Sequence, residues 1–184
     1  MVLLFYSMRK LTFEEIQQLR PQLEDLQCKP RYPFVVLLDN IRSLHNVGAI
    51  FRTADAVFLE HIYLCGITGS PPRDEIRKTS LGAEESVPWT FVHDAHEVVQ
   101  KLRQEGYQIV SLEHTNKSED YRTASYRFPL CLIVGHEYLG IQAALVASSD
   151  MAVEIPMYGI KQSLNVSVAF GVMAYELLNR CINR

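Results

Sequence analysis

The chain has 184 residues, enough for one domain with a sizeable core, and its 48% hydrophobic and 21% charged residues are typical of a soluble globular protein. Its formal net charge of −3 argues against indiscriminate nucleic-acid binding, because phosphate neutralisation requires clustered Lys and Arg. No apolar run reaches the ~20 residues that span a bilayer, and the four scattered cysteines form no CxxC pair. We therefore expect a cytoplasmic protein with no signal peptide, no membrane anchor and no metal.

The N-terminal segment is predicted to be helical. Apolar residues recur at helical spacing over residues 11–27, and Thr12 with Glu15 forms a capping-box pattern. Pro21 should kink or divide this helix. We expect an N-terminal helical extension over residues 1–30 and a main domain over residues 31–184.

The next segment is predicted to form a βαβ unit. The run FVVLLD from Phe34 to Asp39 has no polar alternation, which is typical of a strand buried on both faces of a parallel sheet. Apolar residues from Leu44 to Phe58 then describe one face of a helix, and a short strand follows at His61–Cys65. The stretch GITGSPPR, residues 66–73, contains too much Gly and Pro for regular structure and is predicted to be a loop.

Alternating helices and strands continue to the C-terminus. The predicted elements are a helix near Asp74–Leu81, a strand at Trp89–Val92, a helix at Ala95–Gln104, a strand at Gln108–Glu113, an exposed loop or short helix at His114–Arg127, a strand at Leu130–Val134, a helix at Leu139–Ala147, a strand at Ala152–Ile155 and a long helix from about Leu164. This order predicts an α/β fold with a mainly parallel sheet and helices on both faces.

A first polar stretch follows the strand at Phe34–Asp39, where ligand crevices of open α/β sheets form. This stretch, NIRSLHNVGAIFRTADA, has enough hydrogen-bonding side chains to hold a phosphate or a ribose. An ordinary helix start explains the same residues, with Asn46 as a cap and Arg52 paired with Asp55. Asn46 and Arg52 are separated by about 120° on a continuous helix, so both reach one ligand only if Asn46 lies in the entry turn.

A second polar stretch, LIVGHEYLG, begins at Leu132. Gly135 permits a close approach of the backbone to a ligand, and Glu137 brings a carboxylate to the edge of the sheet, although a simple turn explains both. The zinc motif HExxH is absent because Gly140 stands where its second histidine would be. His93 and His96 are predicted to be solvated rather than metal ligands.

The third polar stretch runs from Val153 to Tyr175. Pro156 and Gly159 favour an irregular loop, and Ser163 is a natural N-cap for the long final helix. Lys161 could hold a phosphate. The chain has no GxGxxG after its first strand, no GxxxxGK[ST] and no GxSxG, which disfavours a nicotinamide enzyme, a P-loop kinase and an α/β-hydrolase.

In their order and separation, the three stretches resemble the motifs of the SpoU (TrmH-like) branch of the SPOUT superfamily of RNA methyltransferases. NIRSLHNVGAIFRTADA is similar to the first motif, the glycine and glutamate of VGHEYLG to the second, and IPMYG followed by SLNVSVAFGVMAYE to the third. KTSLGAEESVPW, residues 78–89, is also similar to the family, and the resemblance spans about Phe34 to Glu176.

The resemblance implies an enzyme that transfers a methyl group from S-adenosylmethionine to a ribose 2′-hydroxyl of tRNA or rRNA. It implies a SPOUT fold with a C-terminal trefoil knot that binds the cofactor in a bent form. Relatives are similar in forming homodimers whose active site combines residues of both subunits. The long C-terminal helix is the candidate interface element.

The resemblance also assigns residues. It implies catalytic roles for Asn46, Arg52, Glu137, Ser163 and Asn165, and cofactor contacts, mainly through the backbone, around Val134, Gly135, Ile155, Met157, Gly159 and Leu164. The predicted RNA-binding residues are Arg42, Arg73, Arg77, Lys78 and Lys161.

Two features separate this chain from the usual pattern or description of the family. His136 stands between Gly135 and Glu137, where the second motif usually has asparagine. Arg52 is often described as a general base in the family, but a guanidinium with a pKa above ~12 is not deprotonated in ordinary proteins. We expect Arg52 to grip a phosphate or hydroxyl electrostatically instead.

Three alternatives to a ribose methyltransferase are consistent with the sequence. A SPOUT enzyme that methylates a base atom would share the cofactor and the knot. A catalytically inactive RNA-binding module would keep the fold alone. A generic α/β nucleotide-binding protein would bind nucleotides but not S-adenosylhomocysteine.

Overall fold

A computed structural model describes residues 8–21, 26 and 29–183 and divides the chain into two units, Met1–Pro30 and Arg31–Arg184. In the first unit, α1 (Phe13–Gln18) begins with the predicted capping box, in which Thr12 and Glu15 each accept the other's backbone N–H. The helix ends before Pro21 and is shorter than expected. Because α1 buries no side chain, no tertiary packing stabilises a longer helix. Residues 22–25 and 27 of the predicted helix lie outside the described residues.

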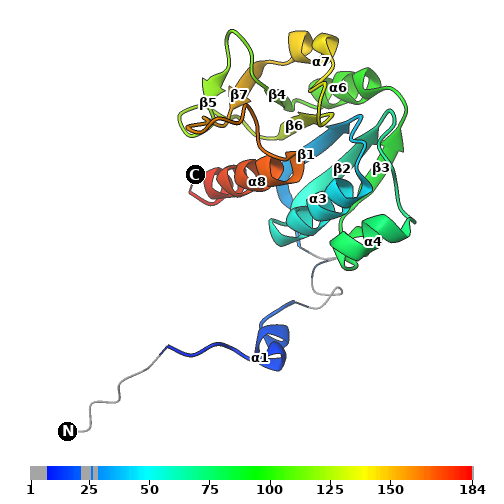
Figure 1. The fold of residues 1–184 in the computed structure, drawn as a ribbon, viewed down its shortest axis with the longest axis vertical. Helices are drawn as coiled ribbons and strands as arrows, with labels where there is room; N and C mark the ends of the chain where they lie inside the picture. The colour runs from blue at the N-terminus through cyan, green and yellow to red at the C-terminus, as the bar shows by residue number, and fades with distance from the viewer. Residues whose placement is uncertain (1–7, 22–25, 27–28, 184) are drawn as a thin grey trace, which may run out of the picture. The chain divides into compact units, whose positions relative to one another are not determined.

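The described part of the second unit contains a seven-stranded sheet in which every pair of neighbouring strands is parallel (Figure 1). Its order is β3-β2-β1-β6-β4-β7-β5. The strands are β1 (Tyr32–Asp39), β2 (Leu59–Cys65), β3 (Trp89–Val92), β4 (Gln108–Leu112), β5 (Glu119–Asp120), β6 (Leu130–Gly135) and β7 (Met151–Glu154). The predicted α/β fold with a parallel sheet is confirmed.

Helices cover both faces of this sheet, as predicted. Figure 1 shows α3, α4 and α8 on one side and α6 and α7 on the other. The helices of the second unit are α3 (Leu44–Ala56), α4 (Asp74–Ser80), α5 (Ala83–Ser86), α6 (Ala95–Gln104), α7 (Ala143–Ser148) and α8 (Val166–Ile182). No helix among the described residues is both long enough and apolar enough to cross a membrane.

The central strands explain the unbroken apolar runs of the sequence. Side chains of β1 alternate between two cores: Phe34 and Val36 pack with α3 and α8, whereas Val35 and Leu37 pack with α6 and α7. Because helices cover both faces of β1, polar residues at alternate positions would be buried without partners.

Three predicted elements differ from the structure. The helix expected from Leu139 begins at Ala143, because Gly140 has a left-handed φ of 68° and Gln142 is bound by Asp39 in an extended turn. The segment at 114–127 contains strand β5 rather than a helix. Helix α8 begins at Val166 with Asn165 as its N-cap, so the prediction that Ser163 caps this helix is wrong.

Candidate functional site

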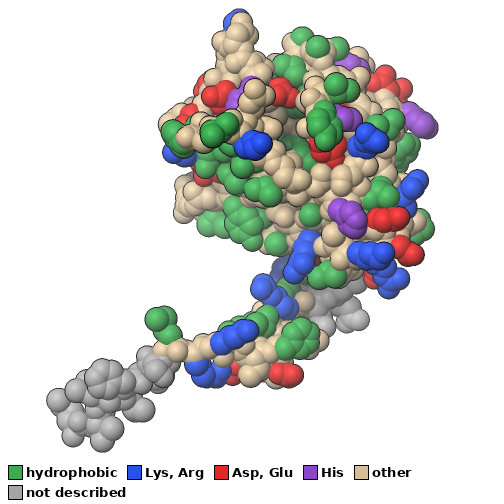
Figure 2. Space-filling model, in the orientation of Figure 1, with side chains coloured by type: hydrophobic (Ala, Val, Ile, Leu, Met, Phe, Trp, Pro, Cys, Tyr) green, Lys and Arg blue, Asp and Glu red, His purple; other side chains and the backbone are tan. Residues whose placement is uncertain are grey.

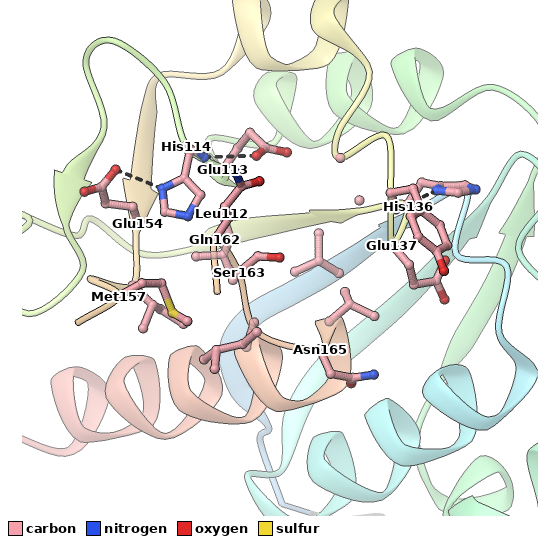
Figure 3. A pocket seen from close by; sticks show the side chains of 18 residues that line it. Leu112, Glu113, His114, His136, Glu137, Glu154, Met157, Gln162, Ser163 and Asn165 are labelled. Atoms are coloured by element: carbon pink, nitrogen blue, oxygen red, sulfur yellow. Dashed lines mark hydrogen bonds and ion pairs between the residues drawn. The ribbon is translucent and has the colours of Figure 1, made fainter. Parts of the chain in front are cut away.

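A cavity of about 320 Å³ opens beside the carboxyl ends of β6, β4 and β7 (Figure 3). Parallel strands bring these ends, and the loops that follow them, to one edge of the sheet. Its lining residues are Leu112, Glu113, His114, Val134, Gly135, His136, Glu137, Tyr138, Gly140, Glu154, Ile155, Met157, Gln162, Ser163, Leu164, Asn165, Val166 and Ala169.

Glu137 is the centre of a hydrogen-bond network beside this cavity. Its carboxylate accepts the backbone N–H groups of Arg42 at 3.1 Å and Ser43 at 3.0 Å, and the side-chain amide of Asn46 at 2.9 Å. Partial burial raises the pKa of Glu137, but the hydrogen bonds from Ser43, Asn46 and Arg42 outweigh it, so the net pKa lies below its ordinary value. Glu137 is therefore a carboxylate at neutral pH.

Asn46 continues the network to the last helix. Its Oδ1 accepts the amide of Asn165 at 3.1 Å, and Asn165 Oδ1 accepts the backbone N–H of Ser167 at 2.9 Å. Ser43, rather than Asn46, is the N-cap of α3. The side chain of Asn46, in the first turn of α3, is therefore available to join the polar stretches that follow β1, β6 and β7.

The loop after β6 is held from both sides. Glu113 at the end of β4 accepts the N–H of Ile141 at 2.9 Å, and Asp39 at the end of β1 accepts the N–H of Gln142 at 2.8 Å. A Cβ on Gly135 would lie 2.3 Å from backbone atoms of the same loop. Gly135 is therefore required for the loop to fold back onto the strand and form this wall of the cavity.

The segment from Ile155 to Leu164 forms the opposite wall of the cavity. Between Ile155 and Leu164, no backbone N–H donates a hydrogen bond to any residue that the structure describes. Ile155, Met157 and Leu164 add apolar surface to the cavity. The segment thus offers backbone donors and apolar contacts together, which are the groups that line small-molecule sites.

Eight of the predicted catalytic and cofactor-binding residues line the cavity. They are Val134, Gly135, Glu137, Ile155, Met157, Ser163, Leu164 and Asn165. Gly159 lies in the same segment but does not line it.

Arg52 is not part of this cavity. It is exposed on α3 and lines a separate hollow of about 520 Å³ with Lys78 and Tyr175. The alternative pairing of Arg52 with Asp55 does not occur among the described residues, and Asp55 accepts the hydroxyl of Ser86 at 2.5 Å. The chain therefore does not bring Arg52 to the network of Glu137, Asn46 and Asn165 beside the cavity.

The predicted RNA-binding residues share one property. Arg42, Arg73, Arg77, Lys78 and Lys161 are all exposed, and none of their charged groups forms an ion pair or hydrogen bond with a described residue. Arg103, Arg122 and Arg180, by contrast, pair with nearby carboxylates. Figure 2 shows basic side chains scattered over the visible face of the second unit rather than gathered in one patch.

A polar group on the far side of the cavity was not predicted from the sequence. Glu154 accepts hydrogen bonds from Ser118 Oγ at 2.6 Å and His114 Nδ1 at 3.2 Å, and these two bonds lower its pKa. Figure 3 shows His114 and Glu154 facing each other across the cavity from Glu137. Their positions after β4 and at the end of β7 could have indicated them, had the strand order been known. No group of three potential metal ligands occurs among the described residues.

An open parallel α/β sheet with a ligand cavity at its carboxyl edge defines a class of ligand-binding proteins and enzymes. Within that class, residues 33–175 match the model of the SpoU rRNA Methylase family. The chain belongs to this family.

Named relatives and solved structures agree with this assignment. The chain is 35% identical to a tRNA (guanosine(18)-2′-O)-methyltransferase of Aquifex aeolicus over 89% of its own length and 75% of the relative's. A solved TrmH/SpoU tRNA modifying enzyme of A. aeolicus superposes with a TM-score of 0.79 at 31% identity, covering 88% of this chain and 81% of the other. An AdoMet-bound rRNA methyltransferase of Sinorhizobium meliloti gives 0.76 at 30% identity, covering 82% and 57%.

Proposed function

We propose that this protein transfers a methyl group from S-adenosylmethionine to a ribose 2′-hydroxyl of tRNA or rRNA. The observation that carries the proposal is the network from Glu137 through Asn46 to Asn165, which joins three remote polar stretches at the rim of the cavity. Relatives named as tRNA 2′-O-methyltransferases match nearly the whole chain, which supports the same reaction.

The cavity residues fit S-adenosylmethionine. The apolar wall of the cavity at Val134, Ile155 and Leu164 suits the adenine ring and the thioether chain. The backbone amides of residues 155–164, which have no acceptor among the described residues, suit hydrogen bonds to the adenine edge. We assign cofactor contacts to these residues and to Gly135, Met157 and Gly159. When bound, the cofactor supplies an electrophilic methyl group on a sulfonium.

The residues of this chain contribute positioning. Methyl transfer requires the hydroxyl to be aligned behind the methyl group and its proton to leave as the new bond forms. Glu137 fixes Asn46, and Asn46 with Asn165 and Ser163 offers amide and hydroxyl groups at the rim, where a ribose would be held. We assign proton removal to the substrate phosphate or solvent.

Arg52 is assigned to the electrostatic grip of the target's phosphate or hydroxyl. The planar fork of its guanidinium suits two oxygen atoms at once, which an ammonium does not. Near-normal methyl transfer by Arg52→Lys at saturating RNA would contradict a role for this fork. RNA contacts are further assigned to Arg42, Arg73, Arg77, Lys78 and Lys161, whose charges are exposed and unpaired among the described residues.

We propose that the enzyme is a homodimer whose sites combine both subunits. The exposed apolar side chains Val168, Tyr175 and Ile182 on α8 support an interface there. The separation of Arg52 from the cavity supports delivery of this residue by a partner. We also propose a trefoil knot, because α8 returns from β7 past β4 and β6 to pack on α3 and β1.

Residues 31–184 are assigned to the methyltransferase domain and residues 1–30 to an N-terminal extension, in agreement with the two compact units. We place the enzyme in the cytoplasm, where its RNA substrates are made.

Two measurements test the function. Calorimetry should detect S-adenosylhomocysteine binding, and its absence at high micromolar ligand would contradict the proposal. RNA methylated by the enzyme should then be digested with nuclease and analysed by mass. A methyl group on the ribose is expected, whereas a methyl group on the base would show a base methyltransferase. Cofactor binding without methylation of tRNA or rRNA would favour an inactive RNA-binding module.

A further inference from the structure

The loop between β6 and α7 is closed at its base by two backbone hydrogen bonds. His136 N–H donates to Gly140 O at 3.1 Å, and Gly140 N–H donates to His136 O at 2.9 Å. Beyond the loop, the N–H groups of Ile141 and Gln142 are held by Glu113 and Asp39. Backbone amides of a tight loop require acceptors, so the amides at its tip must also be accounted for.

The imidazole of His136 supplies the acceptor at the tip. Its Nδ1 accepts the backbone N–H of Tyr138 at 3.0 Å and that of Leu139 at 3.3 Å. No other described residue accepts a hydrogen bond from either amide. An atom that accepts two N–H donors carries no proton, so the ring is neutral and its hydrogen is on Nε2.

This loop is one wall of the proposed cofactor cavity and carries Glu137. Gly135, His136, Tyr138 and Gly140 line the cavity, while Glu137 reaches the start of α3. We infer that His136, as a neutral imidazole protonated on Nε2, is a positioning residue that holds this wall in its cofactor-binding shape. The inference rests on the proposed function for the identity of the ligand.

The charged groups around the loop leave this role to the imidazole. Glu137, Glu113 and Asp39 all accept backbone N–H groups elsewhere rather than pair with His136. The Tyr138 ring lies 6.3 Å from the imidazole centroid.

Two substitutions at His136 separate its acceptor from its bulk. Asn places Oδ1 on Cγ, where Nδ1 is in histidine, so His136→Asn keeps an acceptor that does not titrate. His136→Leu keeps a branched side chain without an acceptor. His93, which is exposed and outside the cavity, provides the control His93→Asn.

Calorimetry with S-adenosylhomocysteine is the first test. We expect His136→Asn and the control His93→Asn to bind within about twofold of the wild type, because both keep an acceptor at position 136. His136→Leu should bind roughly tenfold more weakly, the effect of one to two lost hydrogen bonds.

Equal binding by His136→Leu and the wild type, or weak binding by His136→Asn, would overturn the inference. Nitrogen-15 NMR of the wild-type imidazole gives a readout that needs no variant to fold. A hydrogen on Nε2 of His136 supports the inference, and a hydrogen on Nδ1 overturns it. If the wild type does not bind the ligand at all, the proposed function fails, and the NMR result still decides how the loop is held.

Discussion

Glu137 shows how one carboxylate can serve as a structural and a functional group. It accepts two backbone N–H groups and the amide of Asn46, and these bonds favour its charged form. Because the folded pKa lies below the unfolded value of about 4.3, Glu137 adds stability above that pH and loses it as the pH falls through the folded pKa.

Glu137→Gln should therefore lower the free energy of unfolding by about 1–3 kcal/mol near neutral pH, since its amide nitrogen cannot accept the N–H groups that a carboxylate accepts. Urea unfolding of both proteins across the acidic range is the measurement, with Glu119→Gln on the exposed edge strand as the control. The deficit should shrink in acid; a deficit that grows as the pH falls would contradict this account.

Asn165 combines two tasks that substitutions can separate. It caps α8 through Ser167 and donates to Asn46. Asn165→Ser keeps a good N-cap but loses the bond to Asn46, so methyl transfer should fall with little loss of stability. Asn165→Ala should also lose about 1 kcal/mol of stability. Thermal unfolding and single-turnover methylation would reveal the difference, and equal activity of Asn165→Ser and the wild type would remove Asn165 from the site.

At the scale of elements, α3 and α4 approach each other closely at a glycine. A Cβ on Gly48 would lie 2.0 Å from Thr79 Oγ1 and 2.4 Å from Ile76 O, and Thr79 itself donates to His45 O at 3.1 Å. The first turn of α3, which carries Asn46, is thus positioned by α4.

Gly48→Ala should cost about 1–3 kcal/mol of stability through overpacking, despite the better helix propensity of alanine. Denaturant unfolding of the variant and the wild type is the measurement. A stabilised Gly48→Ala would show that α4 can move away.

Most of the elements could be predicted because their signals are local. The apolar runs of β1 and β6 need two covered faces, and α6 has a regular apolar stripe between clear ends. The start of α7 could not be predicted, because Gln142 is held by Asp39, a residue 103 positions away. Long-range hydrogen bonds override local propensity in this way.

The candidate site was predictable in part for the same reason. A polar residue after a buried strand indicated Glu137, the family resemblance indicated Asn165, and both line the cavity. The strand order cannot be derived from periodicity, so Glu154 was missed and the position of Arg52 outside the cavity was not foreseen.

For the whole molecule, the separation of Asn46 from Arg52 leads to a complementation experiment. If each site takes Asn46 from one subunit and Arg52 from the other, a mixed dimer of Asn46→Ala and Arg52→Ala subunits contains one intact site. Refolding the two inactive variants together should restore about a quarter of wild-type activity, because half of randomly formed dimers are mixed and one of their two sites is intact.

Each variant refolded alone is the control and should stay inactive. No recovery in dimers verified by mass would place both residues in the same subunit, contrary to the proposed arrangement.

The network that joins Asn46 to Asn165 spans 119 residues of sequence. A chain emerging from the ribosome can fold β1, α3 and β2 early, because their contacts are local. It cannot complete the network until Asn165 has been synthesised and has reached the start of α3. Translation that stops before this point therefore yields a polypeptide without a finished site, so the protein acquires its chemistry only at the end of its own synthesis.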